Sequence, residues 1–388
     1  STSTTTSTTT STTTTSTTST TTTSNTTTSS TTTEAPPAAS PPTTSQPTDP
    51  PTPEPTPEPT DGAGSSTTTV PTSTSVPTTA DAPMLTSTNA AFESLAERNP
   101  AVSMSVVRDG APVLQRASGT TVDGASASSD SPMVVASVSK LLTALEISRL
   151  EQAALTDVDG PIPWSVIGIS PHPAWLDVTV RELLAHTSGM PVVRTSWFDG
   201  GDDCRSFLPS LVATPPQPHR GRWTYSNGNY CTLGLLVEST TGVPLGAAAQ
   251  GLLLDPIGLS GVHLTTDGPL PGDVAHGPGL GRLSRLGGAG AYVVSTDDLA
   301  LTLAAMTDDD RATLRWPGVL VDQYGWGHTG TVSGAKACAW ILDDGRTVVS
   351  VTVAGNSPST GGAVCDLVVP ALGADLGNPA GRPVRTPP

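Results

Sequence analysis

The sequence predicts an α+β domain in which an antiparallel sheet flanked by helices lies beside an all-helical lobe. Apolar runs at 101–108 and 111–118 are separated by Asp109-Gly110, and similar runs at 337–342 and 347–353 are separated by residues 343–345. A short Asp/Gly turn between apolar strand-like runs is a strong hairpin signal. The segment between the hairpins has mainly helical periodicity. We therefore expect the hairpins to pair into one sheet and the middle segment to form a second lobe.

Helical patterns account for most of the remaining apolar residues. They cover residues 89–98, 137–155, 178–184, 232–238, 297–306 and 362–372. In the segment 297–306, Thr296 or Asp297 is expected to cap the N-terminus, because a short polar side chain there can accept a hydrogen bond from a backbone N–H.

Composition divides the chain into three parts. Residues 1–83 are rich in Ser, Thr and Pro and include the run PTPEPTPEPT. A segment with so little apolar surface cannot offset the entropy of folding, so we expect a disordered stalk, either O-glycosylated or unmodified. Residues 84–376, roughly 290 in number, are long enough for a large core and form the expected catalytic domain. Residues 377–388 are expected to be a flexible tail.

Charge and hydropathy exclude two classes of partner. The net charge is −16 and no basic run occurs, which argues against nucleic acid as a partner. No apolar run reaches the ~18 residues of a membrane span. A Ser/Thr/Pro-rich segment and an even number of cysteines are typical of exported proteins, so we expect a secreted or cell-envelope protein whose signal or anchor segment preceded Ser1.

The four cysteines lack the CxxC spacing of metal sites, and four free thiols are the alternative to disulfides. Cys204 and Cys231 both lie in the helical middle, whereas Cys338 and Cys365 both lie in the last segment. Pairing within each segment needs no link between lobes, which predicts Cys204–Cys231 and Cys338–Cys365. Each bridge would close a loop of about 27 residues and contribute about 3 kcal/mol in the chain-entropy model.

Two Ser-x-x-Lys strings are present, because the chain has only two lysines and each follows a serine by three residues. Ser137 and Lys140 lie in a helical pattern, where residues i and i+3 share a face. Ser333 and Lys336 lie in a strand-like stretch, where residues i and i+3 point to opposite faces. Only the first pair is therefore expected to bring a hydroxyl and an amine together.

The helix that carries Lys140 is apolar almost all round, which predicts that the helix and the lysine are buried. Burial disfavours the ammonium form and makes a neutral amine available as a base. Ser137, at the start of the same helix, has its backbone N–H where a developing oxyanion can be stabilised. We therefore expect Ser137 to be a nucleophile and Lys140 its base.

Two further motifs carry polar side chains that suit a substrate cleft. Tyr225-Ser226-Asn227 lies in a Gly-rich turn, where a phenol can move a proton and an amide can bind a substrate carbonyl. His328-Thr329-Gly330 precedes the last hairpin, and its glycine permits close approach of the backbone to a ligand. His186 begins a similar string, HTSG, which we interpret as structural.

The order SVSK, YSN, HTG resembles the three motifs of the low-molecular-weight serine D,D-peptidases, the class C β-lactamases and the related esterases. The stretches VTVRELLAHTSGM, GRWTYSNGNYCTLGLLVESTTGVPL and LGGAGAYVVSTDDLALTLAAM are similar to further segments of the same superfamily, so the resemblance covers about residues 85–375. It implies a two-lobed β-lactamase/transpeptidase-like fold with the active site between the sheet and the helical lobe.

The resemblance also implies a role for each motif residue. Ser137 would be acylated, Lys140 would activate it, and Tyr225 would relay the proton to the leaving group. The remaining residues would bind the substrate, through the Asn227 amide, the edge formed by His328, Thr329 and Gly330, and an oxyanion hole made by the backbone N–H groups of Ser137 and Thr331.

Two departures from the pattern bear on the substrate. The third motif has histidine where β-lactamases of this class usually have lysine, a substitution seen in the related D,D-peptidases and esterases. The stretch between Asn227 and His328 is also short for the larger members, so the loops around the substrate cleft are expected to differ.

The favoured function is a D-alanyl-D-alanine carboxypeptidase-like enzyme of the cell wall. An esterase or β-lactamase on the same scaffold, and a non-catalytic cell-surface module, are the alternatives. The expected partner is a small peptide or β-lactam-like substrate, with peptidoglycan as one candidate. The protein itself is expected to be a monomer. The absence of HxH and HExxH spacing predicts no metal, and no cofactor is expected.

Overall fold

The computed structural model describes residues 85–193, 203–265, 269–276, 280–314 and 319–377. The stalk predicted over residues 1–83 lies outside these ranges, as does the tail predicted over 377–388 apart from Gly377. The predictions for those two segments therefore stay predictions.

The centre of the fold is a six-stranded sheet in which every neighbouring pair of strands is antiparallel. Its strands, in spatial order, are β2 (Ala111–Ser118), β1 (Ala101–Arg108), β9 (Thr347–Ala354), β8 (Ala335–Leu342), β7 (Gly325–Val332) and β6 (Leu320–Asp322).

Both predicted hairpins form, and they pair with each other through β1 and β9. Val102 lies opposite Val353 in that pairing, so the first and last strands of the domain meet in the middle of the sheet. The β1–β2 turn has positive φ at both Asp109 (53°) and Gly110 (77°). Two such residues match the turn that suits the right-handed twist of a hairpin, which explains why the Asp-Gly pair predicted it.

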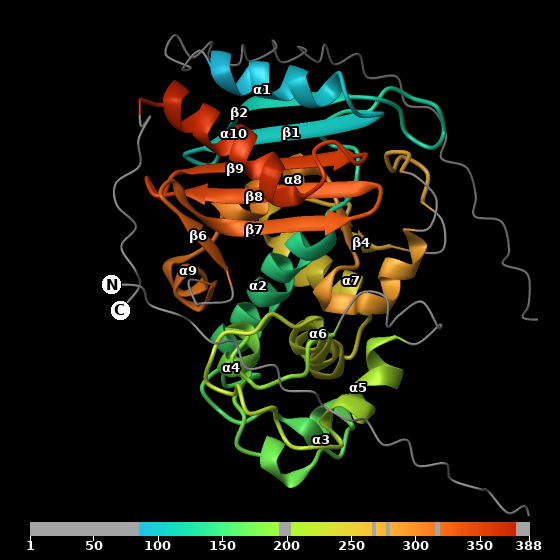
Figure 1. Ribbon diagram of the computed structural model, residues 1–388, viewed down its shortest axis with the longest axis vertical. Helices are drawn as coiled ribbons and strands as arrows, with labels where there is room; N and C mark the ends of the chain where they lie inside the picture. The colour runs from blue at the N-terminus through green and yellow to red at the C-terminus, as the bar shows by residue number, and fades with distance from the viewer. Residues whose placement is uncertain (1–84, 194–202, 266–268, 277–279, 315–318, 378–388) are drawn as a thin grey trace, which may run out of the picture. The chain divides into compact units, whose positions relative to one another are not determined.

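Helices cover both faces of the sheet (Figure 1). Helices α1 (Thr86–Ala96) and α10 (Gly361–Asp375) pack on one face, where Phe92 and Val368 belong to the same buried cluster as Met104 of β1. Helix α8 (Thr296–Ala304) contacts β1 and β9. Its N-cap is Ser295, whose side chain accepts the Asp298 N–H, and not Thr296 or Asp297 as the sequence suggested.

The second lobe is helical and surrounds α2 (Ser139–Gln152) (Figure 1). Eleven residues of α2 are buried, which agrees with the expectation from the apolar composition of this helix. The other elements of the domain are α3 (Trp164–Ile167), α4 (Val180–Leu184), α5 (Cys204–Val212), α6 (Asn227–Thr241), α7 (Leu245–Ala249), α9 (Asp308–Leu314), the helical turns η1 (Ala136–Val138), η2 (Pro173–Trp175), η4 (Gln250–Leu254), η5 (Asp255–Ile257) and η6 (Gly281–Ala289), and a small sheet of β3 (Met133–Val134), β5 (Tyr292–Val294) and β4 (His263–Leu264).

The cysteines form the two predicted disulfides. Cys204–Cys231 joins α5 to α6, and Cys338–Cys365 joins β8 to α10. Each bridge stays within one lobe, as the argument from the two segments predicted. In the described part of the chain, no helix combines the length and the apolar character needed to cross a membrane.

Candidate active site

Ser137 lies in the short 3-10 turn η1, directly before α2. The preceding residue, Ala136, has a φ of +48°, a conformation that is uncommon for a residue with a Cβ. The helix that the sequence predicted to begin at Ser137 thus begins with a tight turn. Backbone strain of this kind is often found where a reactive side chain must be held in one position.

Lys140 follows one turn later and is 1% exposed. Its Nζ lies 3.3 Å from Ser137 Oγ, 3.0 Å from Asn227 Oδ1 and 2.5 Å from the Ala289 carbonyl oxygen. The amide and carbonyl oxygens can only accept hydrogen bonds, so they occupy two N–H groups. In the neutral amine the remaining position is a lone pair that faces the Ser137 hydroxyl, which is the geometry of a general base.

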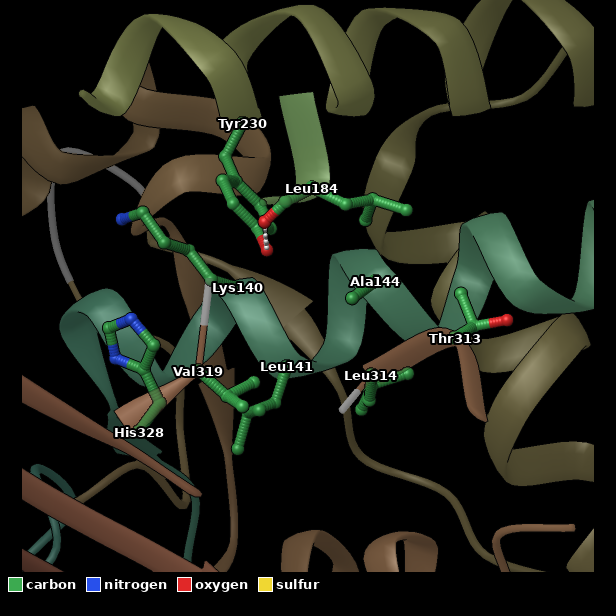
Figure 2. Close-up of a pocket in the computed structure, with 9 residues that line it drawn as sticks. All are labelled: Lys140, Leu141, Ala144, Leu184, Tyr230, Thr313, Leu314, Val319 and His328. Carbon is green, nitrogen blue, oxygen red and sulfur yellow. Dashed lines mark hydrogen bonds between the residues drawn. The ribbon is translucent and has the colours of Figure 1, made fainter. Parts of the chain in front are cut away.

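Burial lowers the pKa of the Lys140 amine, while the neighbouring Tyr225 hydroxyl acts in the opposite direction. A small pocket beside α2 is lined by Lys140, Leu141, Ala144, Leu184, Tyr230 and His328, among others, and Figure 2 shows the Tyr230 and His328 rings on either side of the lysine side chain. The surroundings therefore favour the neutral form that a base requires.

The Tyr225-Ser226-Asn227 turn supplies two of the groups around the nucleophile. The Tyr225 hydroxyl lies 2.9 Å from Ser137 Oγ. Asn227 begins α6, where its Nδ2 donates to the Val193 carbonyl (3.2 Å) and its Oδ1 accepts from Lys140. Asn227 therefore links Lys140 to the carbonyl of residue 193, and its predicted contact with the substrate stays a prediction.

His186, interpreted as structural from the sequence, supports the same turn. Its ring centroid is 4.7 Å from that of Tyr225, and its Nδ1 lies 2.8 Å from Asn229 Nδ2 and 3.4 Å from the Ser226 backbone N. Two donors at one ring nitrogen require that nitrogen to be an unprotonated acceptor. Burial, followed by the positive charge that Lys140 carries when protonated, lowers the pKa of His186 well below its ordinary value, in agreement with a neutral ring.

Strand β7 forms the opposite wall of the site. β8 pairs with the whole of β7 on one side, but on the other side β6 pairs only with its first three residues, at 325–327. On that side, the following residues of β7 have no strand partner in the described part of the chain. A Cβ built on Gly330 would lie 2.2 Å from the Val135 carbonyl oxygen, in the turn that leads to Ser137. The strand can therefore approach the nucleophile this closely only with glycine at this position.

His328 is 5% exposed and neutral. Its Nδ1 lies 2.8 Å from the Thr329 carbonyl oxygen, so this nitrogen carries the proton and donates it to that oxygen. Burial, and then the positive charge that Lys140 carries when protonated, lower the pKa of His328 to about 3. Its ring centroid is 6.3 Å from that of Tyr225, which puts the two side chains at the same end of the site.

The second Ser-x-x-Lys string does not form a pair in the structure. Ser333 lies in the turn between β7 and β8, and the Lys336 amine contacts Val332, Gly355 and Asn356 instead. Sequence reasoning did not identify the carbonyls of Ala289 and Val193, because a backbone oxygen leaves no residue-type signal. The Gly-rich run LGGAGAY around Ala289 was the only indication that the backbone approaches the site there.

Comparisons with known proteins agree with this fold. Residues 88–370 match the family model described as Beta-lactamase. Among solved structures of similar fold are a D-amino acid amidase from Ochrobactrum anthropi SV3 (20% identity, 74% of this chain and 99% of that one, TM-score 0.61) and SurE in a structure with D-Leu (24%, 78% and 78%, 0.61). An octameric penicillin-binding protein homologue from Pyrococcus abyssi is also similar (19%, 76% and 77%, 0.59).

The family match spans most of the domain and includes all three motifs that meet around Ser137. The fold of the similar structures is the α+β architecture expected from the sequence. This chain belongs to the Beta-lactamase family and is a serine-hydrolase-like enzyme of that family.

Proposed function

We propose that this enzyme cleaves a D-alanyl-D-alanine-type amide bond in cell-wall peptides through an acyl-enzyme on Ser137. The observation that carries the proposal is the arrangement around Ser137 Oγ, which lies 3.3 Å from a buried amine and 2.9 Å from a phenol. These two groups give the hydroxyl separate partners for the acceptance and the donation of a proton.

The chemistry follows from these contacts. Ser137 Oγ attacks the substrate carbonyl and its proton passes to Lys140 Nζ, while the carbonyl oxygen becomes an oxyanion held by the backbone N–H groups of Ser137 and Thr331. Collapse breaks the amide bond, and the departing amine takes a proton through Tyr225. Water then attacks the ester, which releases the acyl group and regenerates the serine.

Two kinds of leaving group are candidates, and the protonation state of His328 bears on the choice between them. A carboxypeptidase must accept a leaving group that carries a carboxylate, but His328 is neutral at physiological pH and offers no positive charge to it. A primary amide of a D-amino acid has no such charge and is therefore the second candidate substrate. The solved D-amino acid amidase and the SurE structure with D-Leu support substrates with a D-residue.

The site of action is proposed to be the cell envelope. Disulfides persist in oxidising compartments, and the two bridges indicate an extracytoplasmic protein. Peptide substrates of the wall are found in the same compartment.

A labelled penicillin and a fluorophosphonate, each followed by mass mapping of the adduct, test the nucleophile. We expect the adduct on Ser137, its loss in Ser137→Ala, and normal labelling in the control Ser165→Ala, which removes an exposed hydroxyl on α3. Labelling that persists in Ser137→Ala overturns the assignment. Release of D-alanine from a D-Ala-D-Ala peptide, compared with release of ammonia from the corresponding D-alanine amide, then decides between the two leaving groups.

A further inference from the structure

A second pocket, of about 400 Å³, lies at the far end of β7. It begins at Thr331, whose N–H is the candidate oxyanion donor, and continues along Val332 and Ser333. Leu280 and Leu283 form an apolar part of its lining. Apart from Thr331, none of these residues has a proposed role in the reaction at Ser137.

The pocket contains the second lysine of the chain, Lys336, which is 2% exposed. Its Nζ lies 2.5 Å from the Val332 carbonyl oxygen, 3.3 Å from that of Gly355 and 2.9 Å from Asn356 Oδ1. The Gly334 N–H also donates to Asn356 Oδ1 (2.9 Å), which fixes this atom as an acceptor. Burial lowers the pKa of the Lys336 amine, but its three acceptors require three N–H groups, so the hydrogen bonds are those of an ammonium ion.

The charge of this ammonium has no anionic counterpart within the described residues. No carboxylate forms an ion pair with Lys336 there, and no acidic residue lines the pocket. Ser359, also in the lining, comes just before the N-terminal end of α10, which adds partial positive charge. Buried charges in proteins are normally paired, so this pocket is suited to an anion from outside the chain.

The position of the pocket relative to Ser137 indicates which part of a substrate reaches it. Tyr225, the proposed proton donor to the leaving group, lies near His328, towards one end of the β7 edge. The pocket lies beyond Thr331, towards the other end of the same edge. A substrate whose carbonyl oxygen is held by Thr331 would thus direct its leaving group towards His328 and its acyl group towards Lys336.

We propose that this pocket is a subsite for the acyl donor and that Lys336 selects donors whose side chain ends in a carboxylate. Leu280 and Leu283 would contact the methylene part of such a side chain, and the Ser333 and Ser359 hydroxyls would donate to the carboxylate beside the ammonium. The inference rests on the proposed function, because it uses the orientation of the substrate at Ser137. It adds a charge requirement that the nucleophile and its base do not impose.

Binding to the inert Ser137→Ala protein tests the subsite without turnover. The probes are N-glutaryl-D-alanine amide, which ends in a carboxylate, and N-glutaramyl-D-alanine amide, its neutral counterpart of nearly the same size. Calorimetry should show tighter binding of the carboxylate, by on the order of tenfold to a hundredfold, because the serine hydroxyls would donate to a charged acceptor that lies beside the positive charge of Lys336. Adding Lys336→Met should reduce this preference to about one.

A second pair of variants covers the case in which Lys336→Met fails to fold. Ser333 is exposed in the turn beside the pocket, so Ser333→Asp introduces a negative charge there and Ser333→Asn is its neutral control. Only the aspartate should lower the preference for the carboxylate probe. Equal binding of the two probes to the Ser137→Ala protein, or a preference that either charge change leaves intact, overturns the subsite. If the preference is present but wild-type enzyme turns over neither amide nor peptide, the proposed function fails and the subsite stands.

Discussion

Replacement of Gly330 by alanine should separate catalysis from stability, because this glycine determines how closely β7 approaches the nucleophile. The added Cβ would lie 2.2 Å from the Val135 carbonyl oxygen and 3.2 Å from the Ala136 Cβ. An ordinary contact of a Cβ begins at 3.4 Å, so the strand and the Ser137 turn must separate by about 1 Å or slightly more.

The size of the effect follows from that displacement. A misplacement of ~1 Å costs on the order of a hundredfold in rate, because the oxyanion donor on β7 would no longer reach its position beside Ser137. Crowding of a packed interior by one carbon costs about 1–3 kcal/mol of stability. We therefore expect acylation to fall about a hundredfold while the protein stays folded.

The acylation rate with a chromogenic penicillin, measured beside the thermal midpoint of unfolding, tests this expectation. Gly251→Ala is the matched control, since nothing lies within 4 Å of a Cβ at that helical position, and it should change neither quantity much. A Gly330→Ala enzyme that acylates within a few fold of the wild-type rate would falsify the close approach of β7 to the nucleophile.

Three further outcomes are expected. Lys140→Met should slow acylation by about 10²–10⁴-fold and leave unfolding largely unchanged, because it removes the base and keeps most of the packing; a normal acylation rate would exclude Lys140 as the base. The pKa of His328 is about 3 in the folded protein and near 6.5 in the unfolded chain, so between these values the unfolded state binds more protons and stability falls as pH falls. His328→Gln should flatten that slope in chemical denaturation, and an unchanged slope contradicts a neutral buried ring. Loss of Cys338–Cys365 should lower the free energy of unfolding by about 3 kcal/mol with little effect on the acylation rate. Loss of Cys204–Cys231, which joins α5 to the helix of Asn227, should affect both quantities. Equal effects of the two losses on the acylation rate would contradict this distinction.

The parts of the fold that the sequence predicted well have local causes. The β1–β2 hairpin follows from an Asp-Gly turn between two apolar runs, and α2 from an apolar composition that only a buried helix can satisfy. The disulfide pairs followed from the separation of the cysteines into two segments. For the hairpin and the helix, the residues that determine the structure lie within or directly beside the element, and each disulfide joins cysteines only 27 residues apart.

Strand β7 shows where such reasoning ends. Its sequence, GWGHTGTV, contains three glycines, which are poor strand formers, and no hairpin was predicted there. Pairing with β8 and the approach to Val135 impose the extended conformation, and both contacts involve residues distant in the sequence. The same limit applies to Ala289, whose carbonyl oxygen contacts Lys140 across 149 positions of sequence.

The two lysines of the chain illustrate how local geometry assigns function to residues with the same spacing from a serine. Each amine has three polar partners within hydrogen-bonding distance. At Lys336 all three are acceptors only, so loss of a proton would leave an acceptor without a donor, and these hydrogen bonds favour the ammonium form against the burial that lowers its pKa. At Lys140 the third partner is a serine hydroxyl, which can donate as well as accept, so either protonation state satisfies every partner. The capacity to exchange a proton therefore depends on a nearby serine hydroxyl. The helical turn brings Ser137 to Lys140, whereas the β7–β8 turn keeps Ser333 away from Lys336.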